Sequence, residues 1–235
     1  MTTGYESRRA CMICVEIAGT GFVNKGAELM LLAAVRALAE SGLPIMPVAH
    51  LRQGSAAQRA AAGCGSVTSI GASRFSLVDA AITTACNLLP ERTVAAVGAV
   101  RQRDVDVVLD ASGFAYSDKW GEVGARATAR RYRAWKRAKS VLVLLPQAFG
   151  PFDISAVRSA VGTVVGLADL VFARDESSLE YLKCAFGDDE RFALAPDFTN
   201  LLSAEVGEAG KALTDHVVFV PNRRMVTLFT YNNTL

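Results

Sequence analysis

Polar residues follow two apolar runs in the second half of the chain, at the point where each run stops. Gln147 and Gly150 follow one run, and Arg174 and Asp175 follow the next. Apolar runs of this kind are typical of strands buried in a parallel sheet, and open α/β sheets bind ligands just beyond the carboxyl ends of their strands. We therefore expect an amide, a glycine backbone, a guanidinium and a carboxylate to meet at one sheet edge, where they can bind a polar or anionic substrate.

The neighbours Arg174 and Asp175 have two interpretations. The two side chains can form an ion pair, or Arg174 can bind an anionic ligand while Asp175 caps a helix that begins at Glu176. Aspartate is common at the start of helices for structural reasons, so Arg174 is the better candidate for chemistry.

A glycine-rich segment, Gly19-Thr-Gly-Phe-Val-Asn-Lys-Gly-Ala-Glu, lies between the first predicted strand and the first predicted helix. Gly21 and Gly26 allow the backbone to turn and to approach a ligand closely, and the helix start near Asn24 favours an anion. The segment has neither the Gly-Lys-Ser/Thr of a Walker loop nor the glycine spacing of a dinucleotide site. Substrate binding and an ordinary glycine-rich turn both remain open.

A further segment follows the strand predicted at 106–109 and contains Ser112, Gly113, Tyr116 and Asp118. Its hydroxyl, aromatic and carboxylate groups are of the kind that holds a sugar by stacking and hydrogen bonding. Alternatively, Asp118 caps the helix that follows. The two interpretations are compatible.

Asp197 and Asn222 each follow another predicted strand, and either can add a carboxylate or an amide to a cleft. The only histidines are His50 and His216. Both lie at the edges of predicted strands, so the sequence offers few candidates for a histidine that activates a nucleophile.

Composition indicates a globular protein without a polyanionic partner. The chain has 235 residues, 51% of them apolar, and its 25 basic and 23 acidic residues give a net charge of +2. This near balance does not favour nucleic-acid binding. One basic cluster at helical spacing predicts a solvated helix face, with a docking surface for an anionic substrate or a membrane as the alternative. Its members are Arg126, Arg130, Arg131, Arg133, Lys136, Arg137 and Lys139.

The cysteine pattern is typical of a cytoplasmic protein with reduced thiols. The five of them form no even disulfide framework, and none has a histidine at metal-ligand spacing, so we expect no bound metal. Cys11 and Cys14 lie in a predicted strand, whereas redox-active pairs of the thioredoxin type open a helix. The apolar stretch near the N-terminus is too short for a signal peptide, and no segment is long enough to span a bilayer.

Strand-like and helix-like runs alternate along the chain, which predicts an α/β protein with a Rossmann-like parallel sheet and helices on both faces. We expect strands near 11–17, 45–49, 66–70, 106–109, 141–145, 170–173, 192–195 and 216–220. We expect helices near 25–41, 55–62, 76–89, 91–101, 121–138, 154–167 and 176–186.

The pattern also predicts three parts. Residues 1–202 form the Rossmann-like domain, and the polar, glycine-containing segment 203–215 is a linker. A lone strand at 216–220 cannot bury its own faces, so it either joins the first sheet or begins a second domain that this chain does not complete. We expect the second of these, with residues 216–235 as the start of that domain.

Six segments together resemble the polysaccharide pyruvyl transferase family. They are the glycine-rich segment at 19–28, Asp110-Ala-Ser-Gly-Phe-Ala-Tyr-Ser-Asp, Leu145-Pro-Gln-Ala-Phe-Gly-Pro-Phe, Ala173-Arg-Asp-Glu-Ser, Pro196-Asp-Phe and Val220-Pro-Asn. They run in order over nearly the whole chain. The resemblance implies the N-terminal half of a GT-B-type two-domain architecture, with the active site in the cleft between two Rossmann-like halves.

Members of that family transfer a pyruvyl group from phosphoenolpyruvate to a sugar of a cell-surface polysaccharide or its lipid-linked precursor, and release phosphate. The resemblance implies a small-molecule donor, a saccharide acceptor, no other cofactor, and peripheral contact with the inner membrane face when the acceptor is lipid-linked. An incomplete second domain would expose apolar surface and favour a homo-oligomer. It would also leave the activity of this chain, and its catalytic acid, open.

Carried onto this sequence, the resemblance implies that Asp118 and Arg174 are catalytic. The substrate-binding residues would be Gly21, Asn24, Gly26, Ser112, Gly113, Tyr116, Gln147, Gly150, Asp175, Asp197 and Asn222. Two other classes remain open. One is a non-catalytic domain that binds a sugar or sugar nucleotide, and the other is a GT-B-type glycosyltransferase.

Overall fold

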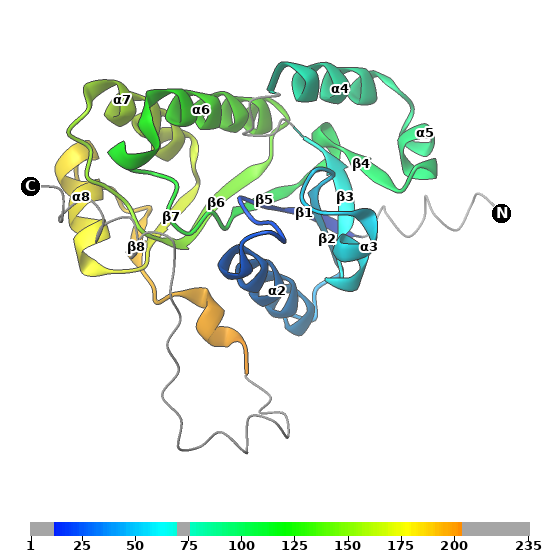
Figure 1. The fold of residues 1–235 in the computed structure, drawn as a ribbon, viewed down its shortest axis with the longest axis horizontal. Helices are drawn as coiled ribbons and strands as arrows, with labels where there is room; N and C mark the ends of the chain where they lie inside the picture. Colours follow the sequence, from blue (N-terminus) through cyan, green and yellow to red (C-terminus); the bar gives the residue numbers. More distant parts are fainter. Residues whose placement is uncertain (1–11, 70–75, 204–235) are drawn as a thin grey trace, which may run out of the picture. The chain divides into compact units, whose positions relative to one another are not determined.

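The computed structural model describes residues 12–69 and 76–203, which form a single all-parallel sheet of eight strands flanked by helices (Figure 1). The strand order is β4-β3-β2-β1-β5-β6-β7-β8. This confirms the predicted Rossmann-like α/β fold. The strands are β1 (Ile13–Ala18), β2 (Ile45–His50), β3 (Gly65–Thr68), β4 (Ala99–Arg101), β5 (Val107–Asp110), β6 (Val141–Gln147), β7 (Leu170–Ala173) and β8 (Phe192–Leu194).

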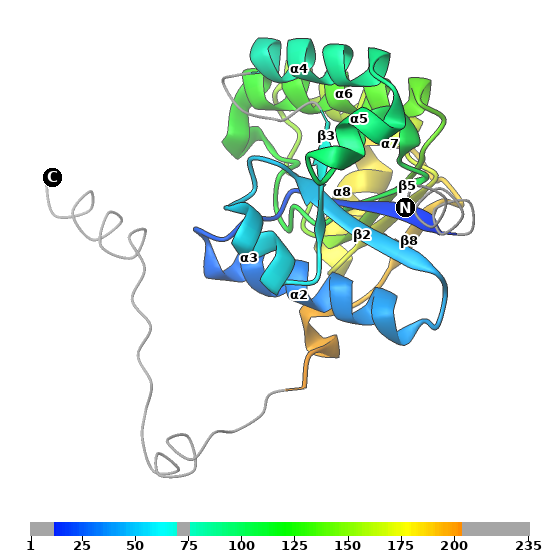
Figure 2. The same cartoon turned by 90° about the vertical axis from the view of Figure 1, so that its right-hand side faces the viewer.

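Helices cover both faces of the sheet, as expected for a parallel sheet whose strands are buried on both sides. Figure 2 shows the sheet between the pair α2 and α3 on one side and the group α4, α6 and α7 on the other. The helices are α2 (Lys25–Glu40), α3 (Ala56–Ala61), α4 (Ser76–Leu88), α5 (Glu91–Ala96), α6 (Gly121–Arg137), α7 (Ser155–Leu167) and α8 (Glu176–Phe186). Short 3₁₀ turns are η1 (Gln102–Asp104), η2 (Asp118–Trp120) and η3 (Phe198–Leu201).

Two apolar cores follow from this layering. On one face, Val157, Val161 and Val164 of α7 pack with Trp135 of α6 and Leu182 of α8. On the other face, the core contains Leu31, Ala33 and Ala34 of α2, with Phe198 of η3. The spacing of these residues follows the helical repeat of about 3.6 residues, which places them on one side of each helix.

The direction of chain growth reverses between β1 and β5. From β1 the chain builds outward through β2, β3 and β4, and it then returns to the other side of β1 to build β5 through β8. Val15 of β1 pairs in parallel with both Pro47 of β2 and Val107 of β5. Such a switch point opens a crevice at the carboxyl ends of the two central strands, where doubly wound sheets bind ligands.

One element was predicted wrongly. The helix expected at 91–101 ends at Ala96, and a strand, β4, follows at Ala99–Arg101 and pairs with β3. Gly98 separates the two with a φ of +70°, a left-handed conformation that ends helices readily. The strand was missed because three residues carry too little periodicity to stand out against the adjoining helical pattern.

The other predicted helices and strands that the structure describes lie within three residues of their predicted ends, whereas the 3₁₀ turns were not predicted. The strand predicted at 216–220, most of the predicted linker and Asn222 fall outside the described residues. Among the helices that the structure describes, none combines the length and the apolar character needed to cross a membrane.

Candidate functional site

Five loops follow the carboxyl ends of neighbouring strands and together form the edge that we call the rim. They are residues 19–24, 111–118, 148–154, 174–175 and 195–200, after β1, β5, β6, β7 and β8. Because every strand is parallel, all five loops leave the sheet at the same edge. The predicted convergence of the candidate residues on one edge is therefore present at the level of the backbone.

Hydrogen bonds between loops join the middle of the rim. The amide of Ala148 donates to the carbonyl of Gly113 at 2.9 Å, and the amide of Gly150 donates to that of Tyr116 at 2.9 Å. On the next strand, the amide of Arg174 donates to the carbonyl of Gln147 at 3.1 Å. The loops after β5, β6 and β7 thus form one connected backbone surface.

At the switch point the loops after β1 and β5 are in close contact. Gly19 has a φ of +77°, and a Cβ atom there would lie 2.1 Å from the Oγ atom of Ser112. Gly113 has a φ of +70° and faces the Met30 side chain of α2. Only glycine fits this approach, so the glycines bring the two loops together, and Ser112 and Gly113 lie at the predicted crevice.

Asn24 has a structural role at the start of α2. Its Oδ1 atom accepts a hydrogen bond from the amide of Gly26 at 2.9 Å, which makes it the N-cap. Asn24 and Gly26 are exposed, and a Cβ atom on Gly21 would meet nothing within 4 Å. The three predicted residues therefore surround an open helix start, where free amide groups favour an anion.

Asp118 is hydrogen-bonded to the segment before α7 and not to the helix that was predicted. Its carboxylate accepts hydrogen bonds from the amides of Asp153, at 2.6 Å, and Ile154, at 3.3 Å, just before α7. Helix α6, which follows Asp118 in sequence, has Trp120 at its N-cap and no side-chain cap. The expectation that Asp118 caps α6 is wrong, because its acceptors are used by a backbone 35 residues away.

Tyr116 lies in the core rather than on an open sugar-binding loop. It is 1% exposed, its ring stacks on Phe149 at 5.6 Å, and its hydroxyl donates to Asp110 at 2.5 Å. The aromatic groups that the same loop leaves accessible are Phe114 and Trp120, whose rings meet edge to face at 6.4 Å. These two rings are better placed than Tyr116 to stack on a sugar.

A buried cluster of polar side chains lies between the sheet and α6. Asp110 accepts hydrogen bonds from the hydroxyls of Tyr116 and Tyr132 and from Ser112, and an Nη atom of Arg131 lies 3.9 Å away. Burial, together with the nearby Asp110 carboxylate, raises the pKa of both tyrosines well above the usual 10. Both hydroxyls therefore remain neutral donors, and the cluster fixes the start of the 111–118 loop.

Glu16 of β1 belongs to the same cluster and was missed as a candidate. Its carboxyl group accepts hydrogen bonds from Ser69 at 2.5 Å and from the indole of Trp135 at 2.9 Å. Burial raises the pKa of Glu16 to about 7, although these hydrogen bonds and the positive charge of Arg131 act against the rise. The sequence did contain a signal for Glu16, because it is a single acidic residue inside an apolar strand.

Gln147 is fully buried at the end of β6, and neither polar atom of its amide has a hydrogen-bond partner among the described residues. Buried amides without partners are rare in folded proteins. The next turn is tightly packed, because a Cβ atom on Gly150, whose φ is +77°, would lie 2.4 Å from the ring of Tyr181. A bound water or a ligand group would satisfy the Gln147 amide.

Arg174 lies between two carboxylates that are themselves helix caps. Its Nε atom is 3.8 Å from Asp175, and its Nη1 atom is 3.7 Å from Asp197. Asp175 accepts from the amide of Ser178 at 2.8 Å, which confirms its predicted capping of α8, and Asp197 caps η3 through Thr199.

These two carboxylates attract the Arg174 guanidinium but do not occupy its hydrogen-bond donors. Both separations exceed hydrogen-bond length, and the Arg174 side chain is 37% exposed. Burial alone would raise the pKa of Asp175, but hydrogen bonds from Ser178 and Ser177 and the charge of Arg174 bring it below its usual value. Arg174 therefore presents donors at the rim that a bound anion can accept.

The comparison with protein families decides the classification. The model of the family described as polysaccharide pyruvyl transferase matches residues 24–233. This chain belongs to the polysaccharide pyruvyl transferase family. A comparison with curated proteins found no match. The matched range begins at the N-cap Asn24 and includes every residue predicted for the site except Gly21.

For a member of the pyruvyl transferase family, the rim provides two kinds of group. The Arg174 guanidinium and the start of α2 are donors, and the rings of Phe114 and, just after the 111–118 loop, Trp120 are aromatic surface. Its carboxylates at Asp118, Asp175 and Asp197 are occupied by backbone amides.

A cavity of about 450 Å³ adjoins the rim between α7 and α8. Its lining includes Asp153, next to the Asp118 cap, and Tyr181, which packs on Gly150. Arg158 and Glu180 contribute opposite charges to the same cavity. Its volume lies within the range of small-molecule sites.

Proposed function

We propose that this chain transfers a pyruvyl group from phosphoenolpyruvate to a sugar of a cell-surface polysaccharide or its precursor, in the cytoplasm and without another cofactor. Family membership supports transferase chemistry of this kind. The observation that carries the proposal is Arg174, a partly exposed guanidinium at the rim whose two carboxylate neighbours lie beyond hydrogen-bond distance.

The chemistry assigns each group a role. A sugar hydroxyl adds to C2 of the enol phosphate while C3 gains a proton, and a second hydroxyl then displaces phosphate to close a ketal. Arg174 would bind the carboxylate or phosphate of the donor and stabilise the charge that develops. Phe114 and Trp120 would hold the sugar ring, and Asp118 remains the candidate base for the hydroxyl.

In the proposed GT-B-type arrangement, a second Rossmann-like half faces the rim and completes the donor site. The proton for C3 would come from that half, because three of the four rim carboxylates, Asp118, Asp175 and Asp197, already accept hydrogen bonds from backbone amides.

The test is release of phosphate from phosphoenolpyruvate by the full chain across a panel of saccharide acceptors. We expect release that depends on the acceptor, and Arg174→Gln should reduce it by about a hundredfold because a charge-assisted contact is lost. Arg92→Gln, an exposed arginine of α5, is the matched control and should retain activity. No release with any acceptor would refute the proposal.

A second candidate is a non-catalytic domain that binds a sugar. The backbone hydrogen bonds to Asp118, Asp175 and Asp197 favour it, because they engage three of the four carboxylates of the rim and leave Asp153 as the exposed one. Calorimetry separates the two, since the binding domain takes up saccharide but not phosphoenolpyruvate. Binding of a nucleotide sugar instead would indicate a GT-B-type glycosyltransferase.

A further inference from the structure

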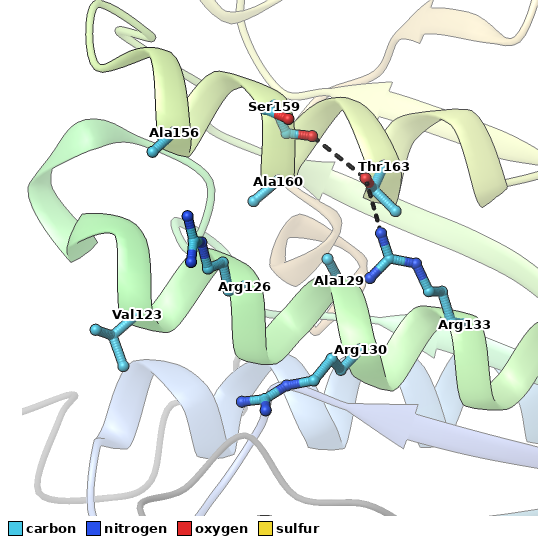
Figure 3. Close-up of a pocket in the computed structure, with 9 residues that line it drawn as sticks. All are labelled: Val123, Arg126, Ala129, Arg130, Arg133, Ala156, Ser159, Ala160 and Thr163. Atoms are coloured by element: carbon cyan, nitrogen blue, oxygen red, sulfur yellow. Dashed lines mark hydrogen bonds between the residues drawn. The ribbon is translucent and has the colours of Figure 1, made fainter.

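Helices α6 and α7 pack side by side and leave a groove of about 470 Å³ between them. Figure 3 shows Arg126 and Arg133 reaching from α6 toward α7, where Ser159 and Thr163 lie. We call this cavity the α6–α7 groove. Among the described residues, its lining is Val123, Arg126, Ala129, Arg130, Arg133, Ala156, Ser159, Ala160 and Thr163.

The groove carries an excess of positive charge. In the part of the chain that the structure describes, three arginines and no carboxylate line it. Arg126 forms an ion pair with Glu122 outside the lining, and Arg133 makes a long hydrogen bond of 3.4 Å to the hydroxyl of Thr163. Cations three and four residues apart on one helix repel one another, so this spacing disfavours the helix unless an anion offsets it.

A fourth arginine of the same helix, Arg131, has a structural role and serves as a comparison. Arg131 is 8% exposed, lies 3.9 Å from the Asp110 carboxylate, and its guanidinium carbon is 5.0 Å from the centre of the Trp135 ring. Arg130 and Arg133, by contrast, are exposed. In Figure 3, Arg133 points toward α7 and Arg130 points away from it. Packing therefore accounts for Arg131, whereas the contacts of the groove arginines are exposed, between Arg126 and Glu122 and between Arg133 and Thr163.

The shape of the groove comes from small residues. Ala129 and Ala160 are buried at its base, where larger side chains would fill the space between the helices. The guanidinium groups of α6 are the donors that suit phosphate oxygens, because arginine can bind them with two parallel hydrogen bonds. On the α7 wall, Ser159 adds a hydroxyl, whereas the Thr163 hydroxyl already donates to the carbonyl of Ser159 at 3.3 Å and accepts from Arg133.

We propose that the α6–α7 groove binds a phosphate group. Two sources share this chemistry, a soluble phosphate or diphosphate ester and the headgroup of an anionic lipid. Val123, 83% exposed at one end of the groove, suits contact with a lipid surface. The described residues that line the groove belong to α6 and α7 and not to the rim, so the proposal does not depend on the activity assigned to the rim.

The experiment compares the full-length chain with the double variant Arg130→Gln/Arg133→Gln. Inorganic pyrophosphate is titrated by calorimetry, and phosphatidylcholine vesicles with and without phosphatidylglycerol are tested by co-sedimentation. We expect binding to at least one probe, a loss of about tenfold or more in the double variant, and weaker binding at higher salt. Arg137→Gln, exposed on the same helix but outside the groove, is the matched control and should stay within about twofold.

Each outcome decides a point. Binding of pyrophosphate that the double variant loses assigns the groove to a soluble phosphate compound, and loss of vesicle binding alone assigns it to a lipid headgroup. Unchanged binding in the double variant, or no binding of either probe by the unaltered chain, overturns the proposal. The thermal unfolding midpoint of the double variant should match that of the unaltered chain, which shows that a loss of binding is not a loss of fold.

Discussion

The buried polar cluster between the sheet and α6 and the rim contain the same kinds of side chain, but these side chains differ in burial and in the length of their polar contacts. In the cluster, Asp110 and Glu16 are 1% exposed and receive short hydrogen bonds from hydroxyl and indole groups. At the rim, the ion pairs of Arg174 are 3.7 and 3.8 Å long and partly exposed. A buried charge must be fully satisfied to be tolerated, whereas an exposed one can exchange its partner for a ligand. The cluster therefore maintains the fold, and the rim retains capacity to bind.

The largest effect is expected at the centre of the cluster. Asp110→Ala removes the acceptor of two buried tyrosine hydroxyls and leaves Arg131 without its carboxylate, so the free energy of unfolding should fall by about 3 kcal/mol or more. Urea denaturation measures the change. Asp188→Ala, whose side chain is 86% exposed, is the control and should stay within about 0.5 kcal/mol. Similar values for both variants would show that the cluster does not stabilise the fold.

Glu16 should make stability depend on pH. Its pKa in the folded protein is about 7 against an ordinary value of 4.5, so between these values the folded state keeps a proton that the unfolded state has lost. Stability is therefore greatest below this window and falls as the pH rises through it, by roughly 3 kcal/mol. Denaturation of the unaltered chain and of Glu16→Gln near pH 5 and near pH 8 measures this. Equal pH dependence in both proteins would contradict the assignment.

Two variants of Asp118 distinguish a structural role of its carboxylate from a catalytic one. Asp118→Ala should cost about 1 kcal/mol of stability, because the amides before α7 lose their acceptor. Asp118→Asn keeps an oxygen that accepts these bonds and should recover most of that stability. Thermal unfolding and phosphate release are measured together. Full activity in Asp118→Asn would exclude a role for the carboxylate as base.

Arg174 should have the smallest effect on stability. Arg174→Gln breaks only long, partly exposed ion pairs, so the free energy of unfolding should change by less than about 0.5 kcal/mol. The same variant should lose the proposed transfer activity. A large destabilisation would place Arg174 with the cluster residues instead, as part of the structure rather than of the site.

Local signals in the sequence predicted most elements and one of the caps, Asp175. Asn24, predicted as a substrate-binding residue, also caps the helix that follows it directly, and each of the two accepts from an amide no more than three residues away. Such contacts are encoded by adjacent residues and need no knowledge of the fold. Asp118 looks the same in sequence, yet it binds amides 35 and 36 residues away, which only the approach of the loops after β5 and β6 makes available.

The sequence by itself determined the alternation of buried strands and amphipathic helices and the family to which the chain belongs. Tertiary structure decided the strand order, the burial of Tyr116 and the separation of Arg131 from its neighbour Arg130. The physical reason is distance along the chain. Helix and strand periodicity depends on neighbouring residues, whereas the partner that makes a polar group structural or leaves it available, such as Asp110 for Tyr132, arrives only when distant segments pack together.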